Sequence, residues 1–285
     1  MTQKRAAASL VFLALCASVA SVSGFGQNNV PSSLRQFFEA MLKNPSALPK
    51  LEELNEVTAR IADTRAEDIE RALPLVLTAL SNQDEHVKSY ACGALFAIAR
   101  RPDGAVLLRE HIKEIGDDLL NSQFQNIQAG ELTILGTLRP PPPEVASILL
   151  RFLKTKHNAN VQAGAIFELL HIAPDSPEVT GSVREFLSRP IGNDIKVAVL
   201  NALGDPKVRD ARLIGDVVAA LQDSDDNVRS TAIQALTRIG KPALERAEPA
   251  LRHLAADPNQ SEQVARDAKS ALQRLDSLRK SDATH

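Results

Sequence analysis

Hydrophobic residues recur along this chain with a helical period. Between Val228 and Gly240 the apolar side chains stand at offsets 0, 4, 7, 8 and 11 from Val228, which places them on one stripe of an α-helix. The same template, in strong or weaker form, begins at five further anchors: Val87, Ile127, Val161, Ile195 and Val264. The pattern therefore predicts a series of similar amphipathic helices.

A second amphipathic segment precedes each anchor. These segments cover residues 69–80, 105–120, 144–153, 179–187, 211–221 and 243–254. Successive anchors lie 33 to 40 residues apart, a period typical of helical-hairpin repeats. A single hairpin cannot bury its apolar stripe alone, so neighbouring hairpins must stack. We predict an all-α fold, an α-solenoid of about six helical hairpins.

The fifth unit carries the most specific pattern. It has Asp223 at the end of its first helix, Val228 and Arg229 at the start of its second, and then the Ala/Leu/Ile stripe. This unit resembles the HEAT-repeat family, including the variant first described in phycobilisome-lyase-like proteins. The resemblance spans residues 66–276 and implies a right-handed superhelix of the armadillo type. It implies no single activity, because one repeat fold serves many purposes.

The Asp–Arg pair typical of the family is complete only at Asp223 and Arg229. At the equivalent arginine position the other repeats have Lys88, Gln128, Gln162, Lys196 and Ala265. We therefore do not expect a continuous ladder of polar side chains along the repeats.

The ends of the chain differ from the repeats. Residues 1–24 have a basic start, an apolar stretch and small residues, which predicts a cleaved secretory signal and a secreted or periplasmic protein with no membrane span after cleavage. Residues 25–65 predict capping helices that shield the first repeat, because terminal repeats must be atypical. Residues 66–276 form the predicted solenoid, and residues 277–285 read as a polar tail.

The charge and the cysteine content of the chain limit the functions that it can have. Cleavage would remove Lys4 and Arg5 and no acidic residue, which changes the net charge of −2 by two further units. An acidic chain has no electrostatic footprint for nucleic acid, and the lack of Trp also argues against the DNA glycosylases of HEAT type. Cys92 would be left as a single cysteine, which we expect to be a small packed hydrophobe.

The sequence patterns of known catalytic sites are missing. There is no G-x-S-x-G, Walker-type loop, C-x-x-C pair or H-E-x-x-H, and no His-Glu dipeptide such as the HEAT-like hydroxylases use to hold iron. Glu168 and His171 share a helical face, and Glu131 stands in the neighbouring repeat. A metal needs three or four converging ligands. We expect both glutamates to face solvent or pair with bases, and we predict no catalytic residue, metal or cofactor.

The second helices of a HEAT-like solenoid line its inner curve, so positions opposite the packed stripe are candidates for binding a partner. These candidates are Phe96, Thr133, Phe167, Leu170, Asn201, Gln234 and Thr237. The apolar members either form a groove for a protein or peptide partner or are buried by neighbouring helices. The sequence favours a noncatalytic interaction scaffold. The alternative is a HEAT-like enzyme, either a metal-dependent oxidoreductase or a lyase acting on a protein-bound group.

Overall fold

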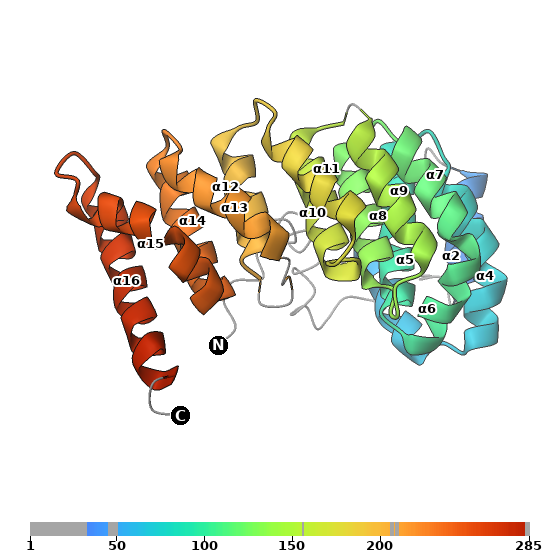
Figure 1. Cartoon of the computed structure of the whole chain (residues 1–285). Helices are drawn as coiled ribbons and strands as arrows, with labels where there is room; N and C mark the ends of the chain where they lie inside the picture. Colours follow the sequence, from blue (N-terminus) through green and yellow to red (C-terminus); the bar gives the residue numbers. More distant parts are fainter. Residues whose placement is uncertain (1–32, 45–50, 156, 206–207, 209–210, 283–285) are drawn as a thin grey trace. The chain divides into compact units, whose positions relative to one another are not determined.

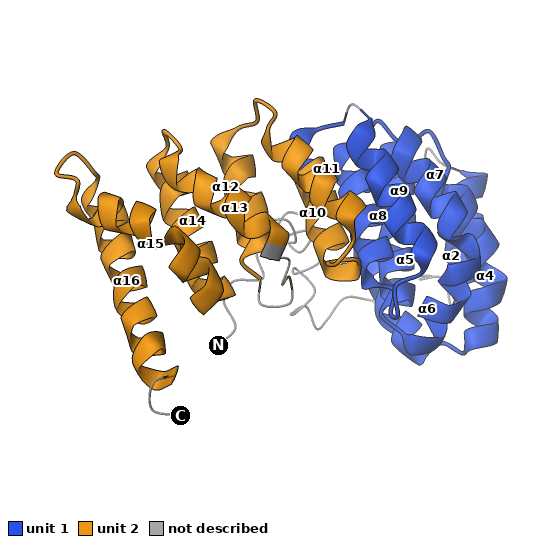
Figure 2. Ribbon diagram, in the orientation of Figure 1, with its two compact units in different colours: residues 1–161 blue, residues 162–285 orange. Residues whose placement is uncertain are grey.

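The computed structural model describes residues 33–44, 51–155, 157–205, 208 and 211–282. The predicted signal at residues 1–24 lies outside these residues. In the described part every regular element is an α-helix or a 3₁₀ helix, and none of them is long and apolar enough to cross a lipid bilayer. The chain divides into two compact units, residues 1–161 and residues 162–285 (Figure 2).

Unit 1 begins with the two helices α2 (Leu34–Lys43) and α3 (Leu51–Arg60), followed by the 3₁₀ turn η2 (Ile61–Asp63) (Figure 1). Its other elements are α4 (Ala66–Leu80), α5 (Glu85–Ala99), α6 (Pro102–Leu108), η3 (Arg109–His111), α7 (Ile112–Asn121), α8 (Gln125–Thr137) and α9 (Pro143–Lys154). The helix α10 (Ala159–Ile172) begins in unit 1 and continues into unit 2.

Unit 2 continues with helices from α11 to α16. These are α11 (Pro177–Leu187), α12 (Asn193–Leu203), η4 (Ala211–Leu213), α13 (Ile214–Ala219), η5 (Ala220–Gln222), α14 (Asp226–Ile239), α15 (Lys241–Ala256) and α16 (Glu262–Asp282). Within this unit α14 packs between α12 and α16, and α15 packs against α16. The second helices of successive hairpins are therefore neighbours, as stacked repeats require.

The predicted hairpins are present. Each anchor lies in the first turn of a helix, in α5, α8, α10, α12, α14 and α16. The stripe that starts at Val87 is fully buried through Ile98, and Val228, Ala232 and Leu236 are buried in the same way. Two of the predicted first helices are broken: α6, η3 and α7 replace one helix, and η4, α13 and η5 replace another. Apolar spacing does not reveal these breaks, because a 3₁₀ turn keeps the same side of the helix in the core.

The N-terminal helices pack on the first hairpin of unit 1. α2 packs on α4, while α3 and η2 pack on α5. Phe37, Phe38 and Met41 of α2 are buried, and the Ser33 hydroxyl caps the helix by accepting a hydrogen bond from the Gln36 N–H at 3.2 Å.

At the other end, α16 extends to Asp282, well past residue 276, where the sequence places the start of a polar tail. Ion pairs from Arg279 to Glu248 and from Asp282 to Lys241 fix these last turns on α15.

Polar side chains at the arginine position bind either the loop of their own repeat or the following repeat. Lys196 of α12 donates to the Asp223 carboxylate of the following repeat at 2.7 Å, and Arg229 donates to the Asp223 carbonyl at 2.6 Å. In unit 1, Gln128 donates to the Ser122 carbonyl at 2.8 Å. The position calls for a hydrogen-bond donor that reaches the preceding loop or the next repeat, and Lys and Gln supply one as Arg does.

Candidate functional site

Two rows of side chains run across the second helices of unit 2. The first, which we call the exposed row, contains the residue six positions after each anchor, and all of its members are exposed: Phe167, Asn201, Gln234 and Ser270. The second, the charged row, lies one helical turn further on and contains His171, Asp205, Arg238 and Arg274. Residues four positions apart lie on the same side of a helix, so each pair of equivalent residues is adjacent.

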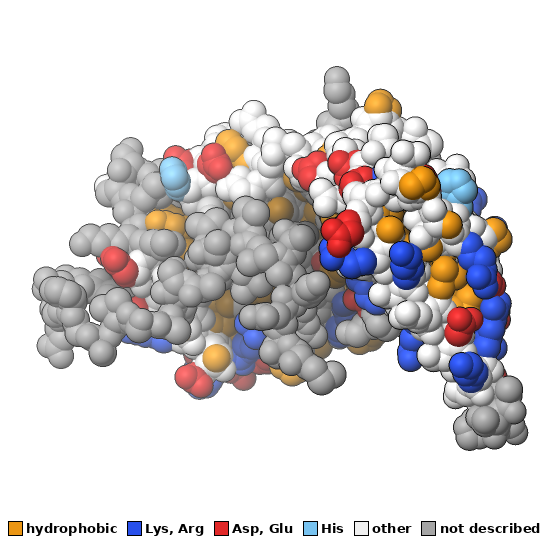
Figure 3. Space-filling model, turned by 90° about the vertical axis from the view of Figure 1, so that its left-hand side faces the viewer, with side chains coloured by type: hydrophobic (Ala, Val, Ile, Leu, Met, Phe, Trp, Pro, Cys, Tyr) orange, Lys and Arg blue, Asp and Glu red, His pale blue; other side chains and the backbone are white. Residues whose placement is uncertain are grey.

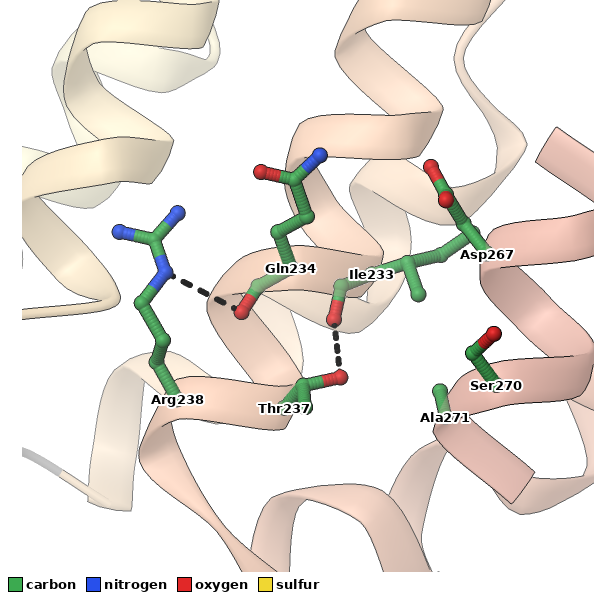
Figure 4. A pocket seen from close by; sticks show the side chains of 7 residues that line it. All are labelled: Ile233, Gln234, Thr237, Arg238, Asp267, Ser270 and Ala271. Atoms are coloured by element: carbon green, nitrogen blue, oxygen red, sulfur yellow. Dashed lines mark hydrogen bonds between the residues drawn. The ribbon is translucent and has the colours of Figure 1, made fainter. Parts of the chain in front are cut away.

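A hollow of about 300 Å³ opens between α14 and α16. The two predicted binding residues of α14, Gln234 and Thr237, both line it. The full lining is Ile233, Gln234, Thr237, Arg238, Asp267, Ser270 and Ala271 (Figure 4). The Thr237 hydroxyl donates to the Ile233 carbonyl at 2.8 Å. Thr237 can therefore offer a ligand only its oxygen lone pairs.

Arg238 is held at the α12 side of this hollow. Its Nη2 donates to Asn201 Oδ1 at 2.9 Å. Its Nε donates to the Gln234 carbonyl at 3.3 Å, as Figure 4 shows. Partial burial lowers the pKa of Arg238, and the nearby Asp205 carboxylate opposes that change. The guanidinium remains charged at any physiological pH, because its ordinary pKa is far above neutrality.

His171 and Asp205 make a second contact within the charged row. His171 Nε2 lies 3.3 Å from Asp205 Oδ2, and Nδ1 lies 2.7 Å from the Phe167 carbonyl oxygen. Both ring nitrogens thus face oxygen atoms of acceptor groups. The Phe167 ring lies against the imidazole, with centroids 4.3 Å apart, and its residue remains 38% exposed.

The other predicted binding residues behave differently. Leu170 is wholly buried, so it belongs to the core and not to a binding surface. It faces inward because the packed stripe of α10 is wider than the template assumed. In unit 1, Phe96 is half-buried beside the Arg100 guanidinium, 5.9 Å from the ring centre, and Thr133 donates to the Ala129 carbonyl at 2.9 Å. Neither of them is among the residues that line the hollow beside Gln234.

Unit 1 has a larger open hollow of about 820 Å³ where α4 ends and α7 begins. It is lined mainly by the end of α4 and the loop at residues 81–83, together with His111 and Glu114. His111 Nδ1 lies 2.9 Å from a Glu114 carboxylate oxygen, so the two titratable groups of this hollow contact each other.

A buried charged cluster lies inside unit 1. The Lys88 ammonium donates to the Leu80 carbonyl at 2.6 Å and to both carboxylate oxygens of Asp118, at 2.6 and 2.7 Å. Glu131 has no exposed surface, and neither of its carboxyl oxygens has a hydrogen-bond partner among the described residues. Burial, with Asp118 nearby, raises the pKa of Glu131 well above its usual range.

The position of Glu131 corrects the expectation that it faces solvent or pairs with a base. Lys88, the base closest to it in the repeat register, is already bound to Asp118. The same burial raises the pKa of the Cys92 thiol, and the predicted packed role of Cys92 is confirmed. No group of three or more His, Cys, Asp or Glu side chains in the described part of the chain is arranged to hold a metal.

Comparison with known proteins agrees with this architecture. The family model for HEAT repeats matches residues 192–273, which include α12, α14 and α15. The match also includes Asn201, Gln234 and Ser270 of the exposed row and Asp205 and Arg238 of the charged row. This part of the chain is therefore identified as HEAT repeats. No protein with a curated function matches its sequence.

A solved structure of a HEAT-like repeats protein has a similar fold. An archaeal HEAT-like repeats protein from Thermococcus onnurineus NA1 is similar over 88% of this chain and 99% of that chain, with 19% identity and a TM-score of 0.50. A designed armadillo repeat protein in complex with the peptide (KR)4 is similar over 86% of this chain and 100% of its own, with 21% identity and a TM-score of 0.37. An engineered protein covers 84% of this chain and 96% of its own, with 20% identity and a TM-score of 0.33.

The HEAT register explains which residues of the site the sequence reveals. Offsets 6 and 9 from the anchors lead to Asn201, Gln234 and Thr237, and the structure places the last two around one hollow. Offset 10 leads to the charged row, which the sequence prediction leaves out. A signal for it is present, because four consecutive repeats have a titratable residue at this offset: His171, Asp205, Arg238 and Arg274.

Proposed function

We propose that this HEAT-repeat protein is a noncatalytic scaffold that binds a protein or peptide partner through the second-helix face of unit 2. We define this face as the exposed row together with the charged row. The observation that carries the proposal is that equivalent polar side chains are exposed on α12, α14 and α16. An open hollow lies beside them between α14 and α16. Repeats that present one or two contacts each can bind an extended partner along several helices.

The side chains of this face are suited to binding. Gln234 and Ser270 form no side-chain hydrogen bond within the described residues, so their polar groups are available to a partner. Phe167 adds a partly exposed ring at the end of the same row. His171 and Asp205 of the face contact each other, and Arg238 binds the side-chain amide of Asn201.

Photocrosslinking tests the binding face directly. Benzoylphenylalanine would be placed at Gln234, and at the exposed Arg252 of α15 as a control on the first-helix layer. After incubation with the exported fraction of the native organism, we expect an adduct from position 234 and none from position 252. Phe167→Asp should remove the adduct without changing the far-ultraviolet circular dichroism. Equal labelling from both positions, or labelling from position 252 alone, would refute the assignment.

We also propose that the protein acts outside the cytoplasm. The support is the signal-like pattern of residues 1–24, with Lys4 and Arg5 ahead of an apolar stretch. Mass spectrometry of the protein recovered from the medium or periplasm should show that these residues are missing. Recovery of the full-length chain from the cytoplasm alone would contradict the proposal.

A further inference from the structure

The hydrogen bond between Arg238 and Asn201 determines which donor and acceptor groups this pair presents to a ligand. A guanidinium only donates, so Asn201 must turn its amide oxygen toward Arg238. The Asn201 amide N–H₂ group is then left to point elsewhere, and it has no partner among the described residues. Arg238 Nη1 likewise has no hydrogen bond within the described part of the chain. The pair therefore presents two donor groups and no acceptor.

Two acidic side chains, one on this face and one beside it, already have partners. Asp205 contacts His171 at 3.3 Å. Asp267 accepts hydrogen bonds from the Ser230 hydroxyl and, at 2.9 Å, from the Gln263 amide. By contrast, no described carboxylate lies within ion-pair distance of Arg238. The face thus has satisfied acids and a cation that is bound only to neutral groups.

Arg274 repeats this situation one hairpin further along. It occupies the position of α16 that Arg238 occupies in α14, it is exposed, and it forms no ion pair within the described residues. On the surface drawn in Figure 3, Lys and Arg side chains lie among Asp and Glu side chains. Other arginines of α15 and α16 form ion pairs, among them Arg252, Arg266 and Arg279.

We infer that the Asn201–Arg238 pair is a carboxylate-binding subsite, that Arg274 provides a second one, and that the partner of this face is an acidic segment. This inference rests on the proposed function and adds the chemistry of the partner. A guanidinium and an amide N–H₂ side by side match the two oxygens of an Asp or Glu side chain, and charge-assisted bonds of this kind are the stronger ones. Asp205 and Asp267 would repel a polyanion such as nucleic acid, whereas spaced single carboxylates can reach the two arginines between them.

The repeat geometry also sets the spacing of the acids. Packed helices lie about 8–10 Å apart, and an extended chain advances about 3.3 Å per residue. Neighbouring repeats are therefore reached by residues about three positions apart in an extended partner. We expect two acidic residues with two residues between them.

Selection from a random dodecapeptide phage library against the full-length protein tests both statements. The enriched peptides would then be synthesised with a fluorescent label and measured by anisotropy against three variants. Arg238→Gln and Arg274→Gln each remove one cation from the face, and Arg252→Gln on α15 makes the same change of charge elsewhere. Circular dichroism of each variant establishes that it is folded.

We expect the enriched peptides to contain acidic residues three positions apart. Each of the first two substitutions should weaken binding by about tenfold or more, and Arg252→Gln should have no such effect. Raising the salt to about 0.5 M should weaken binding as well, because exposed charges are screened. Replacing the Glu residues of a peptide by Gln should abolish the difference between the variants.

Two other results would overturn the inference, and they are distinguishable. In the first, the enriched peptides are neutral or basic, crosslink to position 234 and bind Arg238→Gln as tightly as the unchanged protein. This result would support the binding face and refute the acidic partner. In the second, no peptide is enriched, or the enriched peptides do not crosslink to position 234. This result would refute both the binding face and the acidic partner.

Discussion

Glu131 gives the sharpest test of the buried cluster in unit 1. Its carboxyl group is fully buried, and Lys88 and Cys92 of α5 and Asp118 of α7 are the titratable groups that influence it. Lys88 already has a counterion in Asp118. An ionised Glu131 would therefore be a second negative charge in an apolar site with a single cation. We predict that Glu131→Gln, which keeps the shape and removes the titration, makes the stability of unit 1 less dependent on pH.

The sign and size of this pH effect follow from the linkage between proton binding and folding. The pKa of Glu131 is raised in the folded state, with burial as the main cause and Asp118 as the second, whereas the unfolded chain has an ordinary value near 4.5. The stabilising effect of the bound proton is complete below the unfolded pKa and is lost as the pH rises toward the folded pKa. In that window the free energy of unfolding falls by about 1.4 kcal/mol per pH unit because of this residue. Glu131→Gln should remove that part of the slope.

Tyr90 makes the measurement specific to unit 1. It is the single tyrosine of a chain without Trp, and it lies in α5, which also contains Lys88 and Cys92. Urea unfolding followed by tyrosine fluorescence at several pH values between 5 and 8 gives the free energy of unfolding of the unchanged protein and of the variant. The difference between them should grow in favour of the variant by about 1.4 kcal/mol per pH unit.

The exposed Glu110 of the same unit provides the control, because a solvated carboxylate changes its surroundings little on unfolding. The curve for Glu110→Gln should run parallel to that of the unchanged protein. Parallel curves for Glu131→Gln would show that Glu131 does not retain its proton in the folded state. A curve for Glu131→Gln that falls more steeply with pH than that of the unchanged protein would reverse the sign and refute the reasoning.

Two further predictions concern packing and the N-terminal cap. A Cβ added at Gly204 would lie 2.8 Å from the Cα of Ala235, so Gly204→Ala should push α12 from α14 and lower the stability of unit 2 by about 1–3 kcal/mol in urea unfolding. At Gly116 the same atom would meet three carbons of the Ile148 side chain, at 2.5 to 3.1 Å, and no backbone atom. A side chain moves more easily than a backbone, so Gly116→Ala should cost less, and an equal cost would contradict this account. Arg101 donates hydrogen bonds to the carbonyls of Ala62 and Thr64, just after α3, and it holds the pKa of the Asp103 carboxylate at about 2. Arg101→Gln should therefore speed amide hydrogen exchange in α3 and leave exchange in α14 unchanged. Unchanged exchange would show that apolar packing alone holds the cap.

The helical repeats were predictable because their stripe is set by sequence spacing alone. A residue at an anchor such as Val228, and those 4, 7, 8 and 11 positions later, share one face of any α-helix, whatever surrounds it. The division of the chain at residue 161 was not predictable, because α10 has the same template on both sides of it. The breaks at η3 and η5 were hidden for a related reason, since the apolar spacing continues through them.

The binding face was predictable only in part. Offset 6 is opposite the packed stripe, so Asn201 and Gln234 had to be exposed. Leu170 at offset 9 shows the limit, because a long apolar side chain near the edge of the stripe turns inward where space allows. The hydrogen bond between Arg238 and Asn201 joins residues of two repeats, and no pattern within a single repeat reveals it.

Glu131 shows that the repeat register determines burial even where the side chain is unsuited to it. The residue four positions after an anchor is apolar in the other five repeats, and every one of them is fully buried: Ala91, Ala165, Val199, Ala232 and Ala268. Glu131 holds the same position in α8 and is buried to the same extent. Turning it to solvent would require rotating α8, which would expose Ile127, Ile134 and Leu135 of the same stripe. Retaining a proton on one carboxyl group costs less than exposing three large apolar side chains, so the helix keeps its orientation and the glutamate changes its charge.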